Sequence, residues 1–212
     1  FGLIIAPTWL VAQEIKKWNT GIIISLLIGT AIAYVITVLS PAATPDAWWF
    51  IILSGAIAIC AMILPGISGA FILLLMGKYA YIIGAVSTLN IPVLLLFAIG
   101  AVAGIISFSH LLSWLLEKYH GMTVALLTGF MLGSLNKIWP WKETLETYTD
   151  SHGVIQPLTE RNILPSTFEQ LTGEPALLGW AIFFMVVGFL LIWGIERFAA
   201  ALNKKREANV QE

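Results

Sequence analysis

Long apolar runs separated by short polar corners are the feature that most limits how this chain can fold. Several of these runs reach the roughly 18 residues that an α-helix needs to cross a lipid bilayer. Of the 212 residues, 58% are hydrophobic and only 11% are charged, whereas about a quarter of the residues of a soluble domain are charged. The sequence therefore predicts an all-α fold, built as a polytopic bundle of transmembrane helices.

The apolar runs divide a single membrane domain, residues 1–212, into spans and connections. The predicted parts are spans at about 20–39, 93–116, 122–139 and 176–195, a hairpin with arms at 48–64 and 70–89, a polar loop at 140–175 and a tail at 196–212. The first hairpin arm has about 17 residues, near the lower limit for a span. This length favours a re-entrant hairpin over two full crossings, but the sequence does not separate the two.

Lysines and arginines in short flanks favour the cytoplasmic side of a membrane. The basic cluster within 196–212 therefore predicts a cytoplasmic C-terminus. Counting back through the spans places the acidic loop 140–175 outside and Lys16 and Lys17 inside. Both ends of the hairpin then face the outside.

The hairpin is interrupted by Pro65-Gly66-Ile67-Ser68-Gly69. Backbone polar groups in hydrocarbon must be satisfied internally, so a broken helix survives only beside protein or a watery cavity. Proline suits the first helical position, glycine lets a ligand approach the backbone, and the Ser68 hydroxyl can donate a hydrogen bond. The second half-helix, from Ala70, would present unpaired N–H groups that attract anions. These residues are candidate ligands for an anionic head group, although a simple Pro/Gly kink explains the local pattern equally well.

Lys78 is the next candidate. In a continuous helix it would lie about 15 Å from Ser68, so it reaches the same group only if Gly77 marks a second bend. A charge inside the membrane is usually functional, but a lysine near the interface can also extend its ammonium group to water. The sequence supports both interpretations equally.

Three further polar residues are candidates for coupling or for supporting the site: His110, Ser134 and Lys137. A histidine in a span can relay protons, but a hydrogen-bonded packing role is favoured for His110. Lys137 could meet a head group, although anchoring at the interface beside Trp139 and Trp141 is favoured. The pairs Gly100/Gly104 and Gly129/Gly133 are expected to let helices approach closely.

Several chemistries have no signature here. The chain lacks a GxxxxGK[ST] loop, a His/Cys cluster at metal-binding spacing and a Gly-x-Ser-x-Gly elbow. Its single cysteine, Cys60, excludes an internal disulfide. A net charge of −1 without a basic tract gives no indication of nucleic-acid binding. We expect no metal, no cofactor and no nucleic-acid partner.

Two motifs together resemble the C-terminal half of the bacterial polyprenyl-phosphate (undecaprenyl-phosphate) transporter family, long treated as a domain of unknown function. The first is Ala61-Met62-Ile63-Leu64-Pro65-Gly66-Ile67-Ser68-Gly69-Ala70, followed by Gly77-Lys78-Tyr79. The second comprises Leu111-Leu112-Ser113-Trp114-Leu115-Leu116, Leu126-Leu127-Thr128-Gly129-Phe130-Met131-Leu132-Gly133-Ser134-Leu135 and Trp139-Pro140-Trp141-Lys142. The resemblance covers about residues 60–142.

The resemblance implies a multi-pass protein of the bacterial cytoplasmic (inner) membrane that is a lipid transporter and not an enzyme. It would return undecaprenyl phosphate from the outer to the inner leaflet for carrier recycling, with Ser68 and the N–H groups of Gly66 to Ala70 on the phosphate. Lys78 or Lys137 would complement the charge. The family resembles an inverted repeat with a second Pro-Gly-x-Ser-Gly element, so a missing N-terminal half or a second copy is expected to complete the site. The alternatives are an ion or small-anion transporter using the same break and, less favoured, a lipid-phosphate phosphatase.

Overall fold

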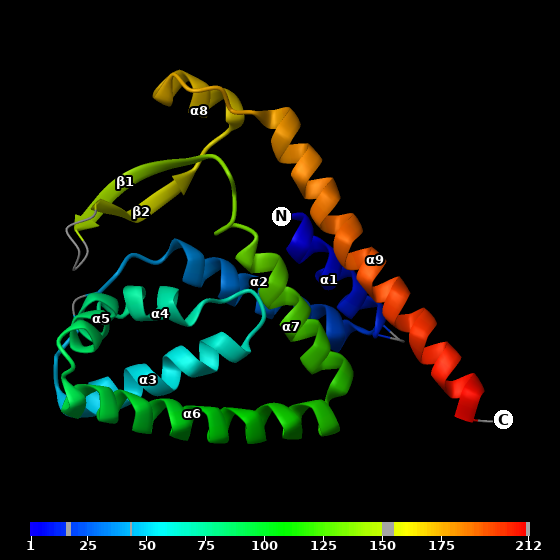
Figure 1. The fold of residues 1–212 in the computed structure, drawn as a ribbon, viewed down its shortest axis with the longest axis horizontal. Coiled ribbons are helices and arrows are strands. Elements are labelled where there is room, and N and C mark those ends of the chain that lie inside the picture. The colour runs from blue at the N-terminus through cyan, green and yellow to red at the C-terminus, as the bar shows by residue number, and fades with distance from the viewer. Residues whose placement is uncertain (16–17, 43, 150–154, 211–212) are drawn as a thin grey trace.

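The computed structural model describes the backbone of residues 1–15, 18–42, 44–149 and 155–210. Lys16 and Lys17, which entered the predicted orientation, lie outside the described residues, as do residues 150–154 of the acidic loop and the side chains of the basic tail from residue 200 onward. In chain order the elements are α1 (Gly2–Gln13), α2 (Thr20–Val38), α3 (Trp48–Ile63), α4 (Gly69–Leu75), α5 (Tyr79–Ser87), α6 (Ile91–Lys118), α7 (His120–Ser134), β1 (Lys142–Thr149), β2 (Ile155–Asn162), α8 (Pro165–Thr172) and α9 (Leu178–Val210) (Figure 1).

Within the described residues, three helices are long and apolar enough to cross a bilayer: α2, α6 and the Leu178–Ala199 part of α9. The bent pair of α4 and α5 would make a fourth span if it counts as one. The prediction of an all-α transmembrane bundle with a broken hairpin is confirmed. The polar segment 140–175, which the sequence treats as a loop, contains the antiparallel pair β1–β2 and the short helix α8.

Helices α2 and α7 form one parallel pair, in which the two backbones pack closely at glycine positions. A Cβ at Gly129 would overlap the carbonyl oxygen of Leu26, and one at Gly133 would overlap that of Thr30. The backbones therefore touch where the small residues stand, as expected of glycine pairs in lipid. The later glycine of α7 contacts the later residue of α2, so the two helices run in the same direction.

Helices α3 and α6 form a second parallel pair, which fixes the depth of the break. The Cys60 thiol donates to the carbonyl oxygen of Gly104 (3.7 Å). Gly104 lies about 20 Å from each end of the 28-residue helix α6. Because α3 ends at Ile63, only three residues beyond Cys60, the break that follows lies near half the depth of α6.

The return arm of the hairpin is short and bends again. Helix α4 has seven residues, about 10 Å, which is too short to cross a bilayer. A bend of 111° then separates α4 from α5, centred on Gly77, whose φ of +63° is one that glycine adopts without strain. The return arm therefore runs back beside α3 from a tip that lies near the middle of α6 (Figure 1).

A third parallel pair, α1 and α9, packs beside this core. A Cβ at Gly2 would overlap the carbonyl oxygen of Met185, and one at Gly188 would lie 3.2 Å from Leu3. Strands β1 and β2 and helix α8 lie at the end of the molecule where α9 begins (Figure 1). The Trp139 Nε1–H donates to the carbonyl oxygen of Ile163 (2.8 Å) and that of Trp141 to Ala176 (2.9 Å). These two bonds attach the segment around the strands to the end of α7.

Candidate functional site

The tip of the hairpin packs against the C-terminal end of α7. Gly66 has φ +91°, and a Cβ there would lie 2.5 Å from the Ser134 hydroxyl oxygen. Ser134 is buried, and its hydroxyl donates to the carbonyl oxygen of Met131 (2.8 Å). Of the predicted supporting residues, Ser134 is thus the one that the structure brings to the break.

Ser68 occupies the N-cap position of α4, and its side chain makes no capping hydrogen bond. It is exposed, as are Gly66 and Ala70, whereas Pro65 and Ile67 are half-buried. The first N–H groups of a helix have no partner within it. The hairpin tip therefore presents an exposed hydroxyl next to the first N–H groups of α4, which have no partner within the helix.

Gly69 has a different environment, because it is buried against α3. A Cβ at this position would lie 2.7 Å from the carbonyl oxygen of Ala58. Beside it is an apolar hollow of about 240 Å³ between α3, α4, α5 and α6, whose lining includes Ala58, Met62, Gly69, Ala70, Leu73 and Phe97. The exposed polar tip thus stands next to a small apolar space.

Lys78 lies at the second bend and not at the break. Its side chain is 1% exposed, and its ammonium group is bonded to the Asp46 carboxylate and to the carbonyl oxygen of Thr44 (3.0 Å). The rings of Phe50 and Tyr81 lie 5.5 and 5.6 Å away. In this arrangement Lys78 holds the segment before α3 against the bend between α4 and α5.

His110 is also separate from the break. It is exposed on α6, and its Nδ1 lies 2.8 Å from the carbonyl oxygen of Ile106 one turn earlier in the same helix. A carbonyl oxygen only accepts, so Nδ1 is the donor. No described contact joins His110 to Ser68, Ser134 or Lys137.

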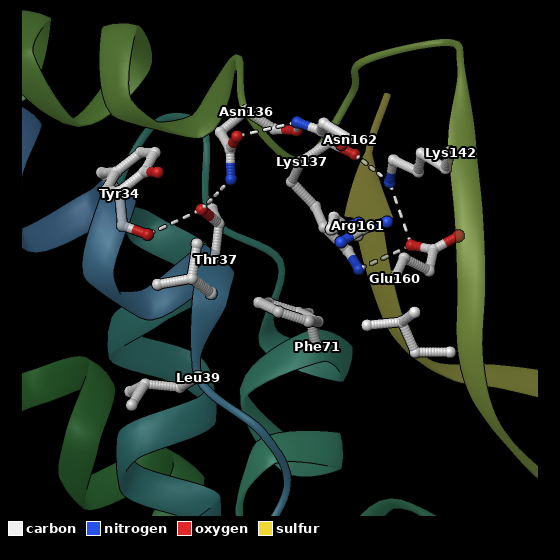
Figure 2. Close-up of a pocket in the computed structure, with 12 residues that line it drawn as sticks. Tyr34, Thr37, Leu39, Phe71, Asn136, Lys137, Lys142, Glu160, Arg161 and Asn162 are labelled. Atoms are coloured by element: carbon white, nitrogen blue, oxygen red, sulfur yellow. Dashed lines mark hydrogen bonds and ion pairs between the residues drawn. The ribbon is translucent and has the colours of Figure 1, made fainter. Parts of the chain in front are cut away.

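Lys137 lies in a polar pocket of about 360 Å³ beneath the β1–β2 pair (Figure 2). The end of α2, helix α4, the segment after α7 and both strands contribute its walls: Tyr34, Thr37, Val38, Leu39, Phe71, Asn136, Lys137, Lys142, Leu145, Glu160, Arg161 and Asn162. The Lys137 ammonium lies 4.7 Å from the centre of the Phe71 ring. Phe71 stands two residues beyond Gly69, so α4 connects this pocket to the break.

The charges in the pocket converge on one carboxylate oxygen. Lys137 and Lys142 both donate to Glu160 Oε2, at 3.0 and 2.9 Å. Burial alone would raise the pKa of Glu160, but the hydrogen bonds and charges of Lys142 and Lys137 outweigh it and lower this pKa. Glu160 is therefore ionised at neutral pH, and the two ion pairs are lost only as the pH falls through the lowered pKa.

An amide network fixes the position of the pocket wall. The Asn136 side-chain amide donates to the Thr37 hydroxyl oxygen (2.7 Å), and the Asn162 amide donates to Asn136 Oδ1 (2.7 Å) and to its carbonyl oxygen (2.8 Å). Strand β2 is thereby joined to the ends of α2 and α7 (Figure 2).

Sequence reasoning did not assign Lys142, Glu160 or Asn162 to a site. Across the strands Lys142 pairs with Asn162, and Thr144 pairs with Glu160. The signal was weak, because these residues belong to a polar segment in which charges are common. Only a prediction of which β1 residues pair with which β2 residues would have placed these side chains near one another.

Comparison with known proteins supports the resemblance. A family model described as VCA0040-like, undecaprenyl phosphate translocase-like, matches residues 1–156. A polyprenyl-phosphate transporter of Vibrio cholerae is 47% identical over 199 residues, which cover 94% of this chain and 65% of that protein. A polyprenyl-phosphate transporter of Staphylococcus aureus is 38% identical over 94 residues, which cover 42% of this chain and 33% of that protein.

The chain thus spans less than two thirds of the length of these curated relatives. No solved structure matches it. The family match over residues 1–156 and the similarity to the Vibrio protein show that the chain belongs to the undecaprenyl phosphate translocase-like family.

Proposed function

We propose that this chain forms part of a transporter that moves undecaprenyl phosphate from the outer to the inner leaflet of a bacterial cytoplasmic membrane, which returns the carrier for reuse. The observation that carries the proposal is the depth of the hairpin tip. Ser68 is exposed at a helix break near half the depth of α6. A phosphate that crosses a membrane needs its donors at this depth, because an unpaired charge in hydrocarbon is very costly.

The groups at the tip suit a phosphate on a lipid. The Ser68 hydroxyl and the first N–H groups of α4 would donate to its oxygens, and Gly66 allows the close approach. The apolar hollow beside Gly69 and Ala70 would accept the first carbons of the polyprenyl tail. The rest of the tail would stay in the surrounding lipid.

The tip supplies donors but no described cation, since Lys78 is bonded to Asp46. A dianionic phosphate at half depth therefore needs further partners. We propose that a second Pro-Gly-x-Ser-Gly element, from an upstream half or from a second copy, faces this tip. The lipid would then be held between two similar breaks.

The test is the change Ser68→Ala, with Ser113→Ala on the exposed side of α6 as the matched control. A hydrogen bond to a charged group contributes about 1.5–3 kcal/mol, so we expect the initial rate of undecaprenyl phosphate inward movement in proteoliposomes to fall about tenfold. The amount of reconstituted protein should be equal for both variants. Normal transport by Ser68→Ala would show that the hydroxyl at the hairpin tip does not bind the phosphate.

The competing function is transport of a small anion through the same break. Competition separates the two: excess inorganic phosphate should leave lipid movement unchanged if the substrate is the lipid. Uptake of inorganic phosphate into the proteoliposomes, blocked by Ser68→Ala, would favour the small-anion transporter.

A further inference from the structure

We propose that the pocket beneath the β1–β2 pair is a second phosphate site, in which Lys137 and Lys142 bind the phosphate monoester head group of a lipid. The identity of the lipid rests on the proposed function. The proposal that the two lysines bind a phosphate monoester does not depend on that function. The pocket is distinct from the hairpin tip, because its walls include neither Ser68 nor Gly66.

The first argument is charge. Two ammonium groups share a single carboxylate oxygen, Glu160 Oε2, so one negative charge faces two positive ones. Arg161 lies at the rim and is paired with Glu143 (2.7 Å). The described residues that line the pocket, together with Glu143, thus carry one more positive than negative charge. A phosphate monoester, which carries about −1.5 to −2 at neutral pH, would compensate it.

The second argument is geometry. Both ammonium nitrogens lie within 3.0 Å of the same oxygen, so a tetrahedral phosphate could bridge them in the same way. The Lys142 ammonium also donates to the carbonyl oxygen of Lys137 (2.6 Å), which holds it in place. Lys137 is 36% exposed, so its remaining N–H groups can reach a ligand that enters the pocket. Glu160 would then act as an internal counter-ion that competes with the ligand.

The third argument concerns the kind of phosphate. Leu39 and Leu145 line the pocket and are each 53% exposed, and the Phe71 ring forms another apolar wall (Figure 2). Apolar side chains beside two ammonium groups suit an amphiphile better than free phosphate. Because Phe71 belongs to α4, the pocket and the tip of the hairpin share this helix.

The experiment measures binding of farnesyl phosphate, with inorganic phosphate and farnesol as comparison ligands, to the purified full chain in detergent. Every variant carries Ser68→Ala, so that the hairpin tip contributes little. Each hydrogen bond to a charged group affects affinity by about tenfold. We therefore expect Lys137→Gln and Lys142→Gln to weaken farnesyl phosphate binding about tenfold each, and Lys118→Gln, at the exposed end of α6, to leave it unchanged.

Glu160→Gln separates a ligand site from a structural ion pair. It removes the same two ion pairs as the lysine variants, but it also removes the competing carboxylate. We expect farnesyl phosphate to bind several-fold more tightly to Glu160→Gln. Weaker binding to this variant, or lysine variants that bind like Lys118→Gln, would overturn the site.

The comparison ligands identify the source of the phosphate. Farnesol and inorganic phosphate should each bind at least tenfold more weakly than farnesyl phosphate. Equal, lysine-dependent binding of inorganic phosphate would overturn the lipid assignment. Loss of transport in Ser68→Ala with unchanged binding in the lysine variants would reject this pocket alone, and the reverse result would reject the hairpin tip alone.

Discussion

Lys78 shows how the partners of a single residue decide between a ligand-binding and a structural role. The side chain is buried, and its ammonium group is held by Asp46 and by the carbonyl oxygen of Thr44. Around the same bend, Ala42 N–H donates to Leu75 O (2.9 Å). Lys78 therefore attaches the segment before α3 to the return arm of the hairpin.

We predict that Lys78→Met lowers thermal stability without weakening farnesyl phosphate binding. Methionine keeps the apolar contacts, but the Thr44 carbonyl oxygen loses its donor, which costs about 1–3 kcal/mol. The Asp46 side chain is 65% exposed and can be hydrated by water, so losing its ion pair with Lys78 adds little to this cost. The measurement is the melting temperature in detergent, with Lys118→Met as control. A stable variant that no longer binds or transports would restore Lys78 to the phosphate-binding set.

Individual site residues differed in how far the sequence could place them. Pro65 to Gly69 stood out because a polar break is costly in hydrocarbon, and its exposed Ser68 follows from that pattern. Glu160 could not be found in this way, because its role depends on two lysines brought near it by the fold. Lys142 lies 18 residues away along the chain.

At the scale of elements, the end of α7 connects the two proposed phosphate sites. Ser134 touches the break at Gly66, and Lys137, three residues later, lies over the Phe71 ring of α4. The position of α7 is set in turn by its glycine contacts with α2. A change in the α2–α7 packing should therefore alter the geometry of both proposed sites.

We predict that Gly133→Ala destabilises the protein, because the added Cβ would overlap Thr30 O and lie 2.6 Å from Ala33 Cβ. Overpacking of this kind costs about 1–3 kcal/mol, and transport should fall as well. The matched control is Gly84→Ala in α5, where no atom lies within 4 Å of the new Cβ and alanine is the better helix former. Equal melting temperatures for the two variants would show that α2 and α7 can separate at no cost.

Elements with strong hydrophobic patterns were predictable, and those without them were not. Helices α2 and α6 follow from uninterrupted apolar runs, and the hairpin follows from its break. Strands β1 and β2 contain many charged and polar residues and pair with two register shifts, so no regular alternation indicated them. The second bend at Gly77 depends on a positive φ, which the sequence suggested only as a possibility.

At the scale of the whole molecule, the parallel pairs define two ends. Helices α2 and α7 both end beneath the strands, and α9 begins at that same end (Figure 1). The corner between α6 and α7 lies at the opposite end, toward which α9 runs. If these helices span a membrane, the β1–β2 pair and the α6–α7 corner lie on opposite sides of it.

The proposed direction of transport requires the strands to face outward, and cysteine labelling tests this orientation. In a Cys60→Ser background, Thr172→Cys on α8 should react with a membrane-impermeant maleimide in intact cells. Glu117→Cys at the end of α6 should react only after the membrane is permeabilised. Both positions are exposed in the structure, so a difference in labelling reports the side of the membrane. The reverse pattern would place the strands that cover the lysine pocket on the cytoplasmic side and would contradict the proposed direction of transport.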